Sequence, residues 1–202
     1  MRIEYEGIPE SDDITFNTMI PILTKFKNLK ILEAGCGTGV LAKYCKSLGN
    51  DVYACDLKNY GLPKNIKFSV QDLNNKVTYK DSTFDVIVAS EVLEHLENGW
   101  EFMREMYRIL KPNGVMIVST PNPSAINCKL RFLFQNEIPY FSYGMFKEIY
   151  HVTPIFDFIF NRMIESKFHI IKTIYIPHKK FGIIFPKNKW FSYNTTWVLR
   201  KI

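Results

Sequence analysis

The chain has 202 residues, of which 47% are hydrophobic and 23% are charged. This balance excludes a mostly disordered protein, and the length fits a single domain over residues 1–202. The formal net charge is +6, and residues 166–202 contain eight Lys or Arg and no acidic residue. The C-terminal part therefore predicts a cationic surface, suited to an anionic substrate, nucleic acid or acidic lipid headgroups.

Helix-like and strand-like segments alternate along the chain, which is typical of a parallel sheet with helices on both faces. The first half predicts a helix over residues 11–26, a strand over 30–34, a helix over 38–48 and strands over 51–55, 66–70 and 84–89. The second half predicts a long helix over residues 91–110, a strand over 115–119, an irregular aromatic segment over 124–150, a helix over 154–167, and strands over 169–176 and 195–201 on either side of a basic loop at 177–193.

The cysteines and the hydropathy pattern indicate a compartment. No two cysteines form a C-x-x-C pair, which excludes zinc-ribbon and thioredoxin-like motifs. We expect reduced core thiols in a cytoplasmic protein, at Cys36, Cys45, Cys55 and Cys128. We also expect no signal peptide, since the first ten residues carry three Glu and no apolar run, and no transmembrane helix.

A glycine-rich turn follows the first predicted strand. Gly35, Gly37 and Gly39 stand at alternate positions, where glycine lets a ligand approach the backbone and the following helix offers free N–H groups. A dinucleotide fingerprint needs glycine where Val40 stands, which disfavours a nicotinamide-dependent dehydrogenase. The Gly-Lys-Ser/Thr of a P-loop is absent as well.

Carboxylates follow the next two predicted strands. Asp56 ends the second strand, where an acid can accept hydrogen bonds from both hydroxyls of a ribose. Asp72 lies just past the third strand, where it can accept from the exocyclic amine of a purine while Leu73 packs on the ring. The three turns together predict a binding site for an adenosine-containing cofactor.

These features together resemble the class I S-adenosylmethionine-dependent methyltransferases. Residues 33–39 match the family's first motif, Glu-x-Gly-x-Gly-x-Gly, and residues 84–87 match its fourth-strand motif. Residues 108–115 match its Leu-Lys-Pro-Gly-Gly entry to the fifth strand, with Asn113 in place of the first glycine. The resemblance implies an α/β, Rossmann-like, doubly wound sheet of seven strands, mostly parallel with an antiparallel last strand.

The resemblance also implies how S-adenosylmethionine is held. The glycine loop would bind the methionine end, Asp56 the ribose and Asp72 the adenine. The full set of implied contacts is Glu33, Gly35, Cys36, Gly37, Gly39, Asp56, Leu57, Gln71, Asp72, Leu73, Ser90 and Glu91. Only nine residues separate Asp56 from Ile66, where the family usually has a helix, so we expect a turn there.

An acidic and histidine-rich segment follows the fourth strand. Glu91, Glu94 and His95 have the i, i+3, i+4 spacing of one helix face, and two carboxylates with an imidazole can bind a divalent cation. Residues 90–96 resemble ubiquinone-biosynthesis O-methyltransferases and also small-RNA 3′-terminal 2′-O-methyltransferases, in which this set and a later histidine hold a metal. His151 is the candidate for the later histidine. In the competing hypothesis no metal binds and the acids only favour the helix N-terminus.

The transfer itself needs an aligned nucleophile, because a sulfonium methyl is already activated. His151 and His95 are the candidate bases for an oxygen or nitrogen nucleophile. We expect O-methylation of a small or lipid-linked metabolite, with RNA 3′-terminal methylation as the alternative enzyme and a non-catalytic cofactor-binding protein as the alternative class. Residues 129–146 are expected to form a lid or acceptor wall, and residues 179–191 to contact a membrane or single-stranded nucleic acid.

Overall fold

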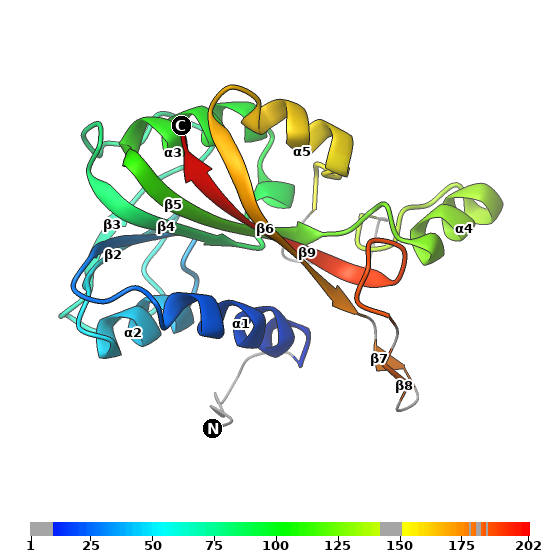
Figure 1. Cartoon of the computed structure of the whole chain (residues 1–202), viewed down its shortest axis with the longest axis horizontal. Helices are drawn as coiled ribbons and strands as arrows, with labels where there is room; N and C mark the ends of the chain where they lie inside the picture. Colours follow the sequence, from blue (N-terminus) through cyan, green and yellow to red (C-terminus); the bar gives the residue numbers. More distant parts are fainter. Residues whose placement is uncertain (1–9, 142–150, 178, 181–182, 185) are drawn as a thin grey trace.

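The computed structural model describes residues 10–141, 151–177, 179–180, 183–184 and 186–202 (Figure 1). Its centre is a seven-stranded sheet with the strand order β3-β2-β1-β4-β5-β9-β6. The strands are β1 (Lys30–Ala34), β2 (Asp51–Asp56), β3 (Lys67–Val70), β4 (Phe84–Ser90), β5 (Leu110–Pro121), β6 (Phe168–Pro177) and β9 (Ser192–Lys201). The predicted α/β sheet of seven strands is confirmed.

The direction of the strands also follows the prediction. β1 pairs in parallel with both β2 and β4, and the ladders β2–β3 and β4–β5 are parallel too. The last strand, β9, lies between β5 and β6 and is antiparallel to both. The chain order reverses between β1 and β4, and in such sheets ligands bind beyond the carboxyl ends of the strands at that point.

Helices cover both faces of the sheet (Figure 1). α1 (Glu10–Leu23) and α2 (Val40–Ser47) lie on one face, where Leu41 and Met19 join a buried cluster with Ile31. α3 (Gly99–Ile109) and α5 (Asp157–Ile164) lie on the other, where a second buried cluster forms around Phe102 and Phe160. Because both faces are covered, most residues of the central strands β1 and β4 are buried, and most of the buried ones are apolar.

The predicted helix over residues 91–110 is wrong in its first third. A short 3-10 helix, η1 (Leu93–His95), is followed by an extended Leu96, and α3 starts only after Asn98. The Asn98 side chain accepts a hydrogen bond from the backbone N–H of Glu101 (3.2 Å) and so caps α3. The extended Leu96 ends η1 and the Asn98 cap begins α3, so the Glu91–His95 segment is separate from the long helix.

Two further segments differ from the expectation. Part of the aromatic segment predicted as irregular forms α4 (Ile126–Gln135), while residues 142–150 lie outside the described residues. Within the predicted basic loop, β7 (Lys179–Lys180) and β8 (Ile183–Ile184) pair as a small antiparallel hairpin.

The expected turn between β2 and β3 is confirmed, since residues 57–66 contain no helix. All four cysteines are free and buried. Of the described helices, none is both long and apolar enough to span a bilayer.

Candidate cofactor and metal site

The glycine loop leaves β1 in a conformation that suits glycine. Gly35, Gly37 and Gly39 have φ values of 71°, 50° and 72°. A Cβ atom on Gly35 would collide with the side chain of Val92, so this loop packs directly against the segment that precedes η1. A Cβ atom on Gly37 would meet no atom within 4 Å. The tip of the loop therefore faces open space, where a ligand can reach the backbone.

The end of β2 holds the loop in place. The backbone N–H groups of Gly35 and Cys36 donate to the Cys55 carbonyl at 2.9 and 3.1 Å. The Asp56 carboxylate accepts from the N–H of Gly37 (2.8 Å) and from the N–H of Leu57 (2.7 Å). Asp56 is only half-buried, and a carboxylate oxygen can accept more than the one hydrogen bond that each oxygen of Asp56 accepts here. The structure thus brings the glycine loop and Asp56 together as predicted.

Glu33 and Cys36 lie under the loop, away from the open side. Glu33 is 4% exposed, and its carboxyl accepts from the N–H of Ala42 in the first turn of α2 (2.7 Å). Burial raises the pKa of Glu33 to about 8, against the lowering effect of that hydrogen bond. The Cys36 side chain is buried in the core cluster beneath the loop. These two residues support the loop from the protein interior.

The residues after β3 divide into exposed and interior groups. The Asp72 side chain is exposed and accepts from Asn74 N–H (2.9 Å) and Asn75 Nδ2 (2.7 Å), which fixes its orientation. Gln71 is buried and its amide bonds to Thr78, and Leu73 belongs to the core. Leu57, at 68% exposure, lies on the open side like Asp72. Of the predicted cofactor contacts in this region, Asp72 and Leu57 are therefore accessible to a ligand, and the positions of Gln71 and Leu73 suit support of the strand end.

Glu91 is held by side chains from two other strands. It has a positive φ of 53° just after β4, and its N–H donates to the Ser119 carbonyl (3.2 Å). Its Oε1 accepts from the Ser119 hydroxyl and from Asn194 Nδ2, both at 2.6 Å. The Ser90 hydroxyl lies 3.3 Å from the Ser119 hydroxyl. Ser119 in β5 and Asn194 in β9 therefore belong to the site, although no motif marks them in the sequence.

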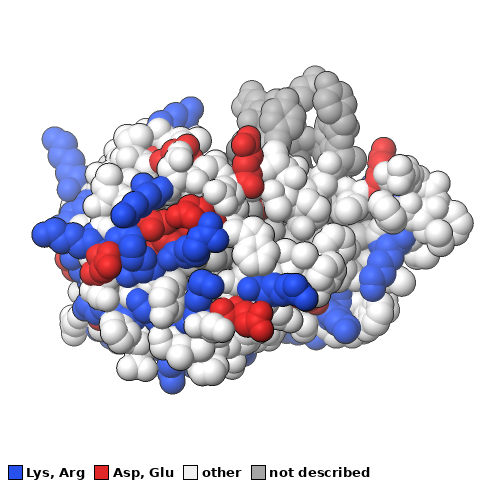
Figure 2. Space-filling model, turned by 90° about the horizontal axis from the view of Figure 1, so that it is seen from above, with Lys and Arg blue, Asp and Glu red and all other residues white. Residues whose placement is uncertain are grey.

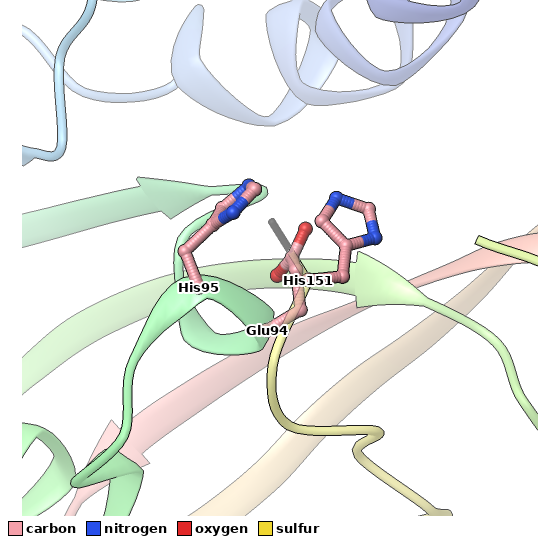
Figure 3. A group of neighbouring side chains, drawn as sticks. All are labelled: Glu94, His95 and His151. Atoms are coloured by element: carbon pink, nitrogen blue, oxygen red, sulfur yellow. The ribbon is translucent and has the colours of Figure 1, made fainter. Parts of the chain in front are cut away.

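Three of the four predicted metal ligands converge. Each of Glu94, His95 and His151 offers a ligand atom, and these atoms lie within 4.8 Å of one another (Figure 3). The two imidazole rings meet edge to face with centroids 4.5 Å apart. Glu91, the fourth predicted ligand, is outside this group and bonds to Ser119 and Asn194 instead. The group is therefore one carboxylate and two imidazoles, a donor set that suits zinc, iron or manganese.

Backbone hydrogen bonds position His151 beside η1. The N–H groups of Val152 and Thr153 both donate to the Glu94 carbonyl, at 2.8 and 3.0 Å. The Thr153 hydroxyl donates to the Leu96 carbonyl at 2.7 Å. A segment almost 60 residues away in the chain is thereby fixed along η1 (Figure 3). This arrangement aligns His151 with Glu94 and His95 independently of any bound ion.

The electrostatics of this group favour a cation. Glu94 is fully buried, and neither of its carboxyl oxygens has a hydrogen-bond partner among the described residues. Burial, with the nearby Glu91 charge, raises the Glu94 pKa well above its ordinary value. Burial and the neighbouring His95 lower the His151 pKa to about 4, so His151 is neutral at pH 7 and able to act as a ligand. A bound cation would supply the partner that the Glu94 carboxylate needs.

Other buried polar atoms lie where the carboxyl end of β5 pairs with the beginning of β9. Within the described part of the chain, the hydroxyls of Thr120, Thr195 and Thr196 and the Asn194 carbonyl oxygen have no hydrogen-bond partner. All four residues are at most 1% exposed. Side chains alternate between the two faces along a strand, so Thr120 and Thr195 lie on one face of the sheet and Asn194 and Thr196 lie on the other.

Comparisons with known proteins agree with this geometry. Residues 32–118 match a family model described as a methyltransferase domain. A ubiquinone biosynthesis O-methyltransferase of Rickettsia bellii is 35% identical over 104 residues, which are 47% of this chain and 43% of that protein. The mitochondrial ubiquinone biosynthesis O-methyltransferase of Rattus norvegicus is 32% identical over 123 residues, 54% of this chain and 36% of that protein. The chain thus spans less than half the length of these two relatives.

Solved structures share the fold over almost the whole chain. An S-adenosylmethionine-dependent methyltransferase from Archaeoglobus fulgidus aligns with a TM-score of 0.69 at 15% identity, covering 98% of this chain and 96% of that one. A second from Methanosarcina mazei aligns with a TM-score of 0.67 at 16% identity, covering 90% and 97%. The sheet order and the glycine loop agree with these similarities: residues 32–118 resemble a methyltransferase domain, and the whole chain shares the fold of the solved S-adenosylmethionine-dependent methyltransferases.

Proposed function

We propose that the protein transfers a methyl group from S-adenosylmethionine to an oxygen atom of a small or lipid-linked metabolite. The observation that carries the proposal is the contact between Gly35 and Val92, which puts the open glycine loop directly beside the segment of Glu94, His95 and His151. A cofactor site and a set of acid and imidazole groups thus adjoin at one edge of the sheet. The names of the partially covering relatives support the choice of oxygen.

Different residues of the chain would bind different parts of S-adenosylmethionine. The open tip at Gly37 leaves room for the methionine end of the cofactor, and the half-buried Asp56 carboxylate can accept from the ribose hydroxyls. Asp72 and the exposed Leu57 are placed to contact the adenine. The cofactor supplies a methyl group already activated on a sulfonium, so these residues need only fix its orientation toward the acceptor.

On the acceptor side, a neutral His151 can accept a hydrogen bond from the acceptor hydroxyl, but a pKa of about 4 makes it a weak base on its own. We infer that Glu94, His95 and His151 hold a divalent cation, which would lower the pKa of the acceptor hydroxyl. Titration calorimetry with Mn²⁺ or Zn²⁺ should show binding that Glu94→Gln abolishes and that His169→Gln, a histidine outside the group, leaves unchanged. Equal binding by wild type and Glu94→Gln would exclude this site.

RNA 3′-terminal 2′-O-methylation is the second candidate, because the same acid and imidazole group is accompanied by the basic segment 166–202. A screen of small phenols, lipid-linked metabolites and short RNAs as acceptors tests both candidate functions. The measured quantity is the release of S-adenosylhomocysteine. Turnover with the metabolites alone supports the proposal, and turnover with RNA alone supports the second candidate. Cofactor binding without release of S-adenosylhomocysteine for any acceptor would favour a non-catalytic binding protein.

The buried free cysteines support the predicted cytoplasmic location.

A further inference from the structure

Helix α4 presents an apolar stripe to solvent. Ile126, Leu130, Leu133 and Phe134 have the i, i+4, i+7, i+8 spacing of one helix side. Their exposed fractions are 37%, 48%, 73% and 78%. Cys128, the buried residue of α4, lies on the opposite side of the helix. A helix that packs on a protein core buries such a stripe, whereas α4 is turned with its apolar side outward.

The position of α4 leaves this stripe accessible. The helix projects beyond the end of the sheet (Figure 1), and the face of that end seen in Figure 2 is mainly uncharged. α4 follows the carboxyl end of β5, the strand that supplies Ser119 to the candidate site. A surface that binds this stripe would therefore lie on the same side of the molecule as the acceptor groups.

Cationic side chains surround the stripe. The turn at residues 186–191 is attached to the start of α4 by a hydrogen bond from the Ile126 N–H to the Trp190 carbonyl (2.8 Å). The Lys129 ammonium lies 4.0 Å from the centre of the Trp190 ring, and Lys189 lies 5.3 Å from it. Lys187 is exposed on the same turn, and Arg131 is on α4.

Two carboxylates reduce this positive charge only in part. Glu137 pairs with Arg131 at 3.1 Å. Asp157 is half-buried and close enough to Lys129 and Lys189 for their charges to lower its pKa, although burial raises the pKa overall. Four basic residues thus face two acidic ones, and the rim of the stripe is net cationic.

We propose that α4 and residues 186–191 form a docking surface for an anionic lipid bilayer. The stripe would lie at the boundary of headgroups and acyl chains, as amphipathic helices do in a membrane interface. Lys129 and Lys189 would reach the phosphates, and Trp190, which has an apolar ring and a polar N–H, suits the interface. A second copy of this chain is a poorer occupant, because the same cations would meet across the contact. The proposal does not depend on methyl transfer.

Sedimentation with vesicles tests the docking surface in the full chain. Wild type should bind vesicles of phosphatidylcholine with 30% phosphatidylglycerol, bind pure phosphatidylcholine much more weakly, and lose binding as salt is raised. The pair Leu133→Gln and Phe134→Gln should weaken partitioning at least about tenfold, because it removes two apolar side chains that enter the lipid. The pair Lys129→Glu and Lys189→Glu should weaken it at least about tenfold as well.

Matched variants far from α4 serve as controls. Val70→Gln removes an apolar side chain of 67% exposure at the opposite edge of the sheet, and the pair Lys25→Glu and Lys27→Glu changes charge beyond α1. Both should bind like wild type. Circular dichroism and thermal unfolding show that each variant is folded, and because neither uses S-adenosylmethionine, failure here stays distinct from failure of the proposed function.

Two outcomes would overturn the proposal. The first is that the α4 variants bind vesicles as well as wild type does. The second is that wild type is a dimer in analytical ultracentrifugation which Leu133→Gln with Phe134→Gln dissociates, since the stripe would then bind a second copy.

Discussion

At the scale of single residues, the buried Glu33 carboxyl couples the cofactor loop to pH. Burial raises its pKa from 4.5 to about 8, so between these values the folded state holds a proton that the unfolded state has lost. The free energy of unfolding therefore falls as pH rises through this window, by about 1.4 kcal/mol per pH unit for a full proton difference. Urea unfolding from pH 5 to 8 should show a smaller fall for Glu33→Gln than for wild type. Exposed Glu97→Gln is the control, and an identical pH dependence of Glu33→Gln and wild type would contradict this account.

At the scale of elements, the position at which α3 begins determines where the Glu94 and His95 side chains lie. The Asn98 cap separates η1 from α3, so Asn98→Ala should lower the free energy of unfolding by about 1 kcal/mol. Asn98→Ser should retain most of the stability, because serine also caps. Urea unfolding of both variants measures this, and equal losses would show that the cap is not the cause.

Sequence patterns were insufficient to predict where α3 begins and how the chain runs before it. The apolar spacing from Leu96 to Leu110 favours one continuous helix, and nothing local reveals that Leu96 is extended and that Glu91 adopts a positive φ. That φ is maintained by hydrogen bonds from the Glu91 N–H to the carbonyl and hydroxyl of Ser119, almost 30 residues later in the chain. Local propensity cannot contain such a tertiary constraint. The glycine loop was predictable because its conformation is dictated by glycine itself.

At the scale of the whole molecule, the sheet and its strand order were predictable because apolar runs, glycine turns and strand-end acids recur in a fixed order along one domain. The group of Glu94, His95 and His151, which we propose as a metal site, was only partly predictable. The predicted set correctly included Glu94 and His95, whereas the Glu91 carboxylate instead accepts hydrogen bonds from Ser119 in β5 and from Asn194 in the antiparallel β9. The outward stripe of α4 could not be foreseen, since an apolar helix pattern ordinarily predicts burial.

We expect S-adenosylmethionine to bind at the carboxyl ends of the first strands of the sheet. Calorimetric titration of wild type, Asp56→Asn and Asp51→Asn with this compound tests it most directly, because the two aspartates begin and end the same strand β2. We predict that wild type and Asp51→Asn bind with similar affinity and that Asp56→Asn binds at least about tenfold more weakly, from the loss of charge-assisted hydrogen bonds. Absence of binding by the folded wild type, or equal affinity of all three proteins, would contradict the account.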